Sequence, residues 1–362
     1  MGFLRLLLAI LVAQQHLGNF PFTGSIAIFG FFVLSGFLVT MIINKTYNDG
    51  MRGKCLFLLN RFLRIYPVYW VCLGLGVLFL TYAPIAGIKI IDHMIIPQSE
   101  WWRQFAIFGL LHFDSHPYFQ MPLATAWSLN VELVYYLVIG LLCGKSRGMC
   151  LLWFIGSLGW FVYALNNVHG EVNNVHNFEQ LFYSYAMCSL EFSTGSLMYH
   201  YQYLVPKWRL GGRVTLLALT YVMVILPGTM TALRIHWGEC HFFSIIGFAY
   251  IIPAMYRLEQ VVLPSKKEGE FIYHYPVNDL ERWCGRISYP FFLLHAPAGA
   301  IVSQYWLHRL GHSFQTFIYT VLFTMLISAI IVYAVEMPIE YWRRKIRTKA
   351  IKKPQALYAN AL

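Results

Sequence analysis

Hydrophobic positions along the chain form runs of about 17 to 22 residues, which is the length a helix needs to cross roughly 30 Å of hydrocarbon. The runs lack the period-two alternation of a transmembrane β-strand. We therefore expect an all-α integral membrane protein, a bundle of about ten transmembrane helices. The predicted spans are 3–20, 26–43, 66–84, 126–143, 150–166, 181–200, 214–228, 240–256, 287–306 and 315–336.

Composition supports a membrane protein. Hydrophobic residues make up 58% of the 362 residues and charged residues only 12%. The hydrophobic share is larger than a soluble protein can bury in its core. The net charge of +11 is spread over the loops instead of forming one patch with interleaved aromatic residues. We therefore expect no nucleic-acid partner, and we expect the basic loops to contact anionic membrane lipids. The seven cysteines show no CxxC or Cys/His spacing, so we expect neither a disulfide framework nor a metal site.

The basic residues also predict the orientation. With a cytosolic N-terminus, all of the 27 basic residues except Lys89, Arg103, Arg234 and Arg309 lie on the cytosolic side, as the positive-inside rule requires. Both termini are then cytosolic. The apolar stretch 104–113 is too short to span, and a crossing there would invert every later loop. We therefore predict a transmembrane domain over 1–342, with an external loop at 85–125 that holds a re-entrant segment, and a basic cytosolic tail over 343–362.

The first span contains two ionisable residues on one face. Arg5 and His16 are eleven positions apart, about three helical turns and roughly 16 Å along the axis. Ionisable groups inside a span are candidates for a functional site that faces the bundle interior. The alternative is an Arg that extends to the inner surface and a His bonded to a neighbouring carbonyl.

The fourth span carries a second polar pair. Ser128 and Glu132 in AWSLNVELVYY (126–136) are four positions apart and share a face near the outer end of the helix. A carboxylate on the same outer half as His16 is expected to orient the imidazole, as in a base supported by a third group. A structural glutamate bonded across helices is the alternative.

Two further motifs add candidates. Arg61 and Arg64 in RFLRIYPVYW (61–70) lie at the cytosolic end of the third span, where guanidinium groups suit phosphate, although positive-inside topology alone would also place them there. In FGFFVLSGFLVT (29–40), small residues indicate close helix packing, and Ser35 is a candidate ligand contact. His295 in SYPFFLLHAP and Glu191 in SLEFSTG are weaker candidates.

Together these motifs resemble the acyltransferase 3 family of bacterial integral-membrane O-acyltransferases. The resemblance rests on Arg5 and His16, FFVLSGFLVT (31–40), the paired arginines before IYP, WSLNVELVYY (127–136) and, more loosely, ISYPFFLLHAP (287–297). It implies a multi-pass protein of the bacterial inner membrane that transfers an acyl group, usually acetyl, from cytosolic acyl-CoA to a hydroxyl of a glycan or other acceptor. His16 matches the essential histidine of the family. Direct transfer to the acceptor is the expected route.

On this hypothesis acetyl-CoA is a donor substrate and no cofactor is tightly bound. Arg5, Arg61 and Arg64 hold its phosphates, the pantetheine arm runs toward His16, and His16 acts as general base. Candidates for contacts with the substrate or the oxyanion are Trp127, Ser128 and His295. The alternatives are a transporter or exporter of a lipid-linked glycan and a non-catalytic scaffold, and succinyl transfer is an alternative to acetyl transfer. The 85–125 loop is the candidate for acceptor selection.

Overall fold

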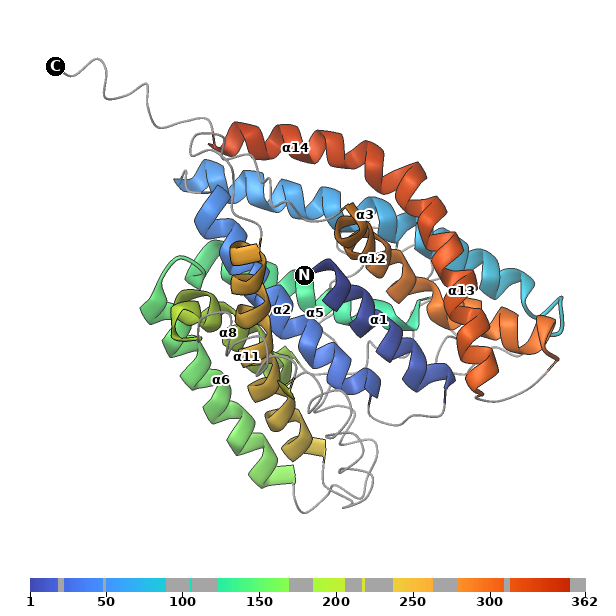
Figure 1. The fold of residues 1–362 in the computed structure, drawn as a ribbon, viewed down its shortest axis with the longest axis horizontal. Coiled ribbons are helices and arrows are strands. Elements are labelled where there is room, and N and C mark those ends of the chain that lie inside the picture. The colour runs from blue at the N-terminus through green and yellow to red at the C-terminus, as the bar shows by residue number, and fades with distance from the viewer. Residues whose placement is uncertain are drawn as a thin grey trace.

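The computed structural model describes residues 1–18, 23–47, 50–88, 105, 123–168, 185–205, 217–218, 237–262, 279–308 and 313–351. Over these ranges the chain is helical and contains no strand (Figure 1). The α-helices are α1 (Gly2–Leu17), α2 (Thr23–Thr46), α3 (Gly50–Tyr82), α5 (Trp127–Leu137), α6 (Arg147–Val168), α8 (Tyr185–Tyr201), α11 (Trp237–Val262), α12 (Asp279–Ala300), α13 (Phe314–Ile331) and α14 (Met337–Ile351). Three π-helical segments extend α5, α12 and α13: η5 (Val138–Cys143), η8 (Ile301–Trp306) and η9 (Val332–Glu336).

Four helices among the described residues are long and apolar enough to cross a membrane: α2, α3, α6 and the continuous helix Phe314–Ala350. Helices α1 and α5 with η5 are shorter apolar helices. These findings support a multi-pass membrane protein, whereas the count of ten spans and the orientation stay predictions. The predicted seventh span (214–228) and the external loop (85–125) lie mostly outside the described residues.

Helices α1 and α12 pack side by side and in parallel (Figure 1). At the start of α1, the amino group of Met1 and the backbone N–H of Gly2 both donate to Oε1 of Glu281, the latter at 2.9 Å. At the other end, an added Cβ on Gly299 would lie 2.5 Å from Cδ2 of Leu17. The pair is therefore held in one register along its whole length, and it carries the ionisable face of α1.

Helices α2 and α8 cross at a contact made by glycine. A Cβ on Gly36 would lie 2.3 Å from the carbonyl oxygen of Phe192, and one on Gly195 would lie 2.0 Å from the carbonyl oxygen of Val33. The two helix backbones can approach this closely because Gly36 and Gly195 have no side chain. The predicted packing role of the small residues in 29–40 is confirmed.

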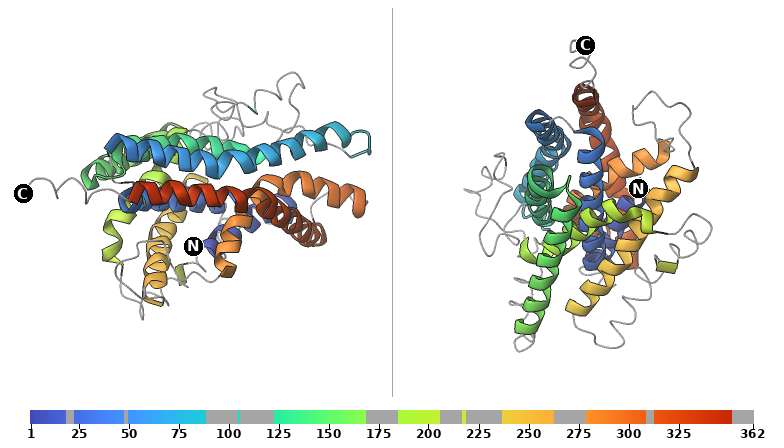
Figure 2. Two further views of the ribbon diagram at one scale, coloured as in Figure 1. Left: turned by 90° about the horizontal axis from the view of Figure 1, so that it is seen from above. Right: turned by 90° about the vertical axis from the view of Figure 1, so that its left-hand side faces the viewer.

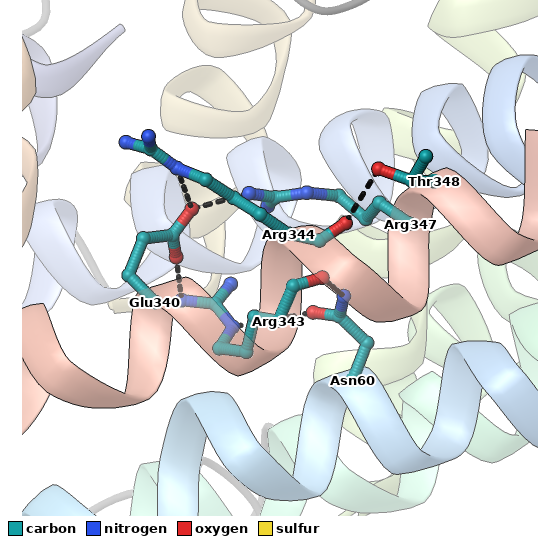
Figure 3. A network of polar contacts seen from close by, with 6 residues as sticks. All are labelled: Asn60, Glu340, Arg343, Arg344, Arg347 and Thr348. Carbon is teal, nitrogen blue, oxygen red and sulfur yellow. Dashed lines mark hydrogen bonds and ion pairs between the residues drawn. The ribbon is translucent and has the colours of Figure 1, made fainter.

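Helix α14 changes the expected picture of the C-terminal region. Residues 343–351 were predicted to belong to a tail, but α14 continues the helix through η9 and lies beside the long helix α3 (Figures 1 and 2). Arg343 is only 3% exposed. Its Nε donates to Oδ1 of Asn60 at 3.2 Å, and its Nη1 donates to Glu340 at 2.7 Å (Figure 3). The predicted boundary after residue 342 therefore falls inside a packed helix.

Candidate active site

A polar cavity lies where α1, α2, α3, α5 and α12 meet. It has a volume of about 80 Å³, several times what a water molecule needs. Its charged and hydroxyl-bearing lining residues are Arg5, Ser35, Arg64, Ser128, Glu132, Tyr136, Ser288 and Tyr289, and the rest of the wall is apolar. Residues that the sequence places on five separate segments thus share one site.

Glu132 is held by two hydroxyl groups. Ser35 on α2 donates to its Oε1 at 2.6 Å, and the hydroxyl of Tyr136, one turn further along α5, donates to the same oxygen. Ser35 was predicted as a ligand contact, and it lies in the cavity wall. Tyr136 was not predicted. The signal that could have found it is its four-residue spacing from Glu132, which places both side chains on one face of the helix.

The position of Glu132 differs from the expected one. Oε1 of Gln15, next to His16, accepts from the backbone N–H groups of Gly24 and Ser25 at 2.8 and 3.1 Å, so the start of α2 lies level with His16. Ser35 is ten residues further along α2, about 15 Å of helix. Glu132 therefore lies near the level of Arg5, and the predicted contact between Glu132 and His16 is wrong.

The arginines give the cavity a positive character. Arg5 and Arg64 both line it, facing the single carboxylate of Glu132. In the part of the chain that the structure describes, no ion pair joins either guanidinium to Glu132. Two cations and one anion leave an excess of positive charge, which suits an anionic ligand.

Arg61 lies beside the cavity rather than in its wall. It is 7% exposed, and its guanidinium carbon lies 5.5 Å from the ring centroids of Phe57 and of Tyr136. Among the described residues, its Nε has no hydrogen-bond partner. The structure thus brings Arg61 to the same end of the site as Arg5 and Arg64, within cation–π distance of two aromatic rings.

His16 contacts a second histidine. Its Nδ1 lies 2.9 Å from Nε2 of His295 on α12, and Nδ1 of His295 lies 2.8 Å from the carbonyl oxygen of Phe292. His16 is exposed, whereas His295 is 0% exposed. His295 was predicted as a contact to the substrate or the oxyanion, but both its ring nitrogens are directed to protein groups.

The two remaining candidates lie at the start of α5. Ser128 lines the cavity, and its hydroxyl donates to the carbonyl oxygen of Thr125 at 3.0 Å. Trp127 is buried and packs edge-on against Phe32, with ring centroids 6.1 Å apart. These positions bring Ser128 to the cavity and give Trp127 a packing contact.

A second, apolar cavity lies behind His295. Its volume is about 400 Å³, and it is lined by apolar and aromatic residues of α3, of the segment 83–88 that follows it, and of α12, η8 and α13. Leu294, Pro297 and Ala298, which flank His295 in the sequence, form part of the wall. The size lies within the range of small-molecule sites, and the lining suits hydrocarbon.

Comparisons with known proteins agree with this picture. The family described as "Acyltransferase domain" matches residues 2–337. The chain is 32% identical over 145 residues to the peptidoglycan O-acetyltransferase OatA of Listeria monocytogenes. The matched segment covers 37% of this chain and 22% of that protein. It is 30% identical over 190 residues to a Staphylococcus aureus protein provisionally named an O-acetyltransferase, covering 47% of this chain and 30% of that protein.

These matches therefore span less than a third of either relative. No solved structure gives a significant match to the chain. The family match, in contrast, extends over nearly all of the chain and includes every residue of the polar cavity. The chain belongs to the acyltransferase 3 family.

Proposed function

We propose that this protein transfers an acetyl group from acetyl-CoA to a hydroxyl of a cell-surface or lipid-linked glycan in the bacterial inner membrane. The observation that carries the proposal is the pairing, on one helix, of a basic cavity at Arg5 and an exposed histidine at position 16. The two groups are separated by roughly 16 Å of helix. That separation matches an elongated donor with phosphates at one end and a thioester at the other.

The donor end of the site is formed by arginine. Arg5 and Arg64 in the cavity wall, with Arg61 beside them, bind the phosphates of CoA through charge-assisted hydrogen bonds. Because the cavity of about 80 Å³ is far smaller than CoA, it takes only part of the donor. Glu132, held by Ser35 and Tyr136, sets the position of these hydroxyls and balances part of the positive charge.

The acceptor end is formed by His16. As general base it removes the proton of the acceptor hydroxyl, and the oxygen attacks the thioester carbonyl. The apolar cavity lined by Leu294, Pro297 and Ala298 supports a lipid-linked acceptor, because its wall suits a hydrocarbon chain and these residues flank His295 in the sequence. The name of the Listeria relative, a peptidoglycan O-acetyltransferase, supports a glycan acceptor.

The test is transfer of label from acetyl-CoA into the lipid and glycan fractions of membranes that contain the wild type or His16→Ala at matched protein levels. We expect label with the wild type only. His308→Asn is the matched control, because His308 is also an exposed histidine and has φ of 49°, which Asn tolerates. Equal incorporation by wild type and His16→Ala would refute the role of His16. Transport of a glycan without CoA release would refute acyl transfer.

A further inference from the structure

We propose that His295 is a positioning residue that fixes the tautomer of His16, so that Nε2 of His16 is the nitrogen that accepts the proton of the acceptor hydroxyl. The chemical role rests on the proposed function. The tautomer itself does not, because it follows from hydrogen bonds within the protein.

The carbonyl oxygen of Phe292 determines which nitrogen of His295 carries the proton. A carbonyl oxygen can only accept, so Nδ1 of His295, at 2.8 Å from it, must carry a proton. In a neutral imidazole the other nitrogen is then an acceptor. Nε2 of His295 therefore presents a lone pair to its neighbour, His16.

The contact between the two rings then determines the tautomer of His16. Nδ1 of His16 lies 2.9 Å from Nε2 of His295. Since Nε2 of His295 has the lone pair, Nδ1 of His16 must donate. A neutral His16 then carries its proton on Nδ1, and its lone pair is on Nε2.

This tautomer requires a neutral His295, because an imidazolium would reverse the hydrogen bond to His16. The residue is 0% exposed and lies among aromatic rings, with centroids 6.4 Å from Phe291 and 6.1 Å from Phe292. No carboxylate contacts it among the described residues. A buried charge without a counter-ion is costly, so His295 is neutral.

The packing of α1 against α12 keeps this contact in place. Gly2 and Glu281 at one end, and Leu17 and Gly299 at the other, hold the two helices in register. Glu281 and His295 each lie 279 positions after their partners on α1. The contact between the histidines therefore has the same sequence offset as the contact between Gly2 and Glu281, as expected for two parallel helices, and the packing of the whole interface determines its position.

The tautomer determines how the transfer runs. Nε2 of His16 takes the proton as the acceptor oxygen forms its bond to the thioester carbonyl carbon. The carbon–sulfur bond then breaks, the sulfur leaves as a thiolate, and the proton on Nε2 passes to it to give the CoA thiol. Throughout, the N–H at Nδ1 of His16 stays hydrogen-bonded to Nε2 of His295. This hydrogen bond stabilises the imidazolium of His16 and keeps its ring from turning.

Nitrogen-15 NMR of the full-length protein in bilayers, with labelled histidine, tests the tautomer without any assay of activity. The chain has 13 histidines, and the His16 signals are assigned by their loss in His16→Asn. We expect a protonated Nδ1 and an unprotonated Nε2. A wild-type His16 with its neutral proton on Nε2 would overturn the proposal, whatever the enzyme does.

Two substitutions of His295 separate positioning from packing. In His295→Gln the side-chain amide oxygen can reach the place of Nε2 and accept from His16, whereas in His295→Asn the amide is too short. We expect His295→Gln to keep the Nδ1–H tautomer and most of kcat. His295→Asn should lose the fixed tautomer and lower kcat at least tenfold, with little change in KM for acetyl-CoA. Equal tautomers in the two variants would overturn the proposal, whereas a correct tautomer with no acyl transfer in the wild type would overturn only the proposed function.

Discussion

The hydroxyl of Ser35 on α2 donates to Oε1 of Glu132 on α5 at 2.6 Å. This bond joins two segments that lie 97 positions apart in the sequence, and it does so in the wall of a cavity that also contains Arg5 and Arg64. A hydrogen bond to a charged group contributes about 1.5–3 kcal/mol. The bond therefore has both a structural and an electrostatic effect on the proposed donor site.

Ser35→Ala should lower kcat/KM for acetyl-CoA at least about tenfold, because losing 1.4 kcal/mol is a factor of ten. The control is Ser128→Ala. Ser128 lines the same cavity but donates to the carbonyl of Thr125, so we expect a smaller effect. Initial rates over a range of acetyl-CoA concentrations measure both. Equal losses in the two variants would argue against a specific role for the contact with Glu132.

Arg64→Gln should raise KM for acetyl-CoA by roughly 10-fold to 150-fold, since a charge-assisted hydrogen bond to phosphate is lost. Arg64→Lys should fall between this variant and the wild type, because lysine keeps the charge but not the forked geometry. Arg282→Gln serves as the control, since Arg282 is exposed and pairs with Asp279. An unchanged KM in Arg64→Gln would remove Arg64 from the donor site.

Gly36→Ala should lower the thermal stability of the purified protein. The new Cβ would lie 2.3 Å from the carbonyl oxygen of Phe192, and overpacking of this kind typically costs 1–3 kcal/mol. Gly156→Ala is the matched control on α6, where an added Cβ meets nothing within 4 Å. Fluorescence-detected size exclusion after heating measures the difference. A Gly36→Ala protein as stable as Gly156→Ala would mean that α2 and α8 can separate without cost.

Asn60→Ala should loosen α14 from α3. It removes both hydrogen bonds to Arg343 and leaves the buried guanidinium Nε without a partner, at a cost of about 1–3 kcal/mol. We expect faster tryptic cleavage within the basic sequence of α14. Thr348→Ala is the control, because its exposed hydroxyl donates to the carbonyl oxygen of Arg344 in the same helix (Figure 3). Identical cleavage rates in the two variants would contradict the packed α14.

Ala298→Phe should fill part of the apolar cavity behind His295. We expect it to raise KM for a lipid-linked acceptor at least several-fold and to leave transfer to a water-soluble sugar unchanged. Leu322→Phe controls for added bulk, because Leu322 is exposed on α13. The same change in KM for both acceptors would show that the cavity does not hold the lipid chain.

Features of this protein that depend on residues close together in the sequence can be predicted from the sequence alone. Helices and their apolar lengths follow from local composition, and the positions of Arg5 and His16 on one face follow from helical periodicity. The close packing of the glycines in 29–40 is also local, because small residues have few other uses in an apolar helix.

Features that depend on how helices pair were not accessible in this way. Periodicity gives the face of a residue but not its depth relative to another helix, so the sequence placed Glu132 beside His16, whereas α2 and α5 meet at the level of Arg5. The contact between His16 and His295 spans 279 positions and depends on the register of α1 against α12. Hydrophobic composition and charge thus determined a helical membrane protein with an ionisable first span, while tertiary packing decided which polar groups share a site, because the relative height of two helices is set by side chains that interlock across their whole interface.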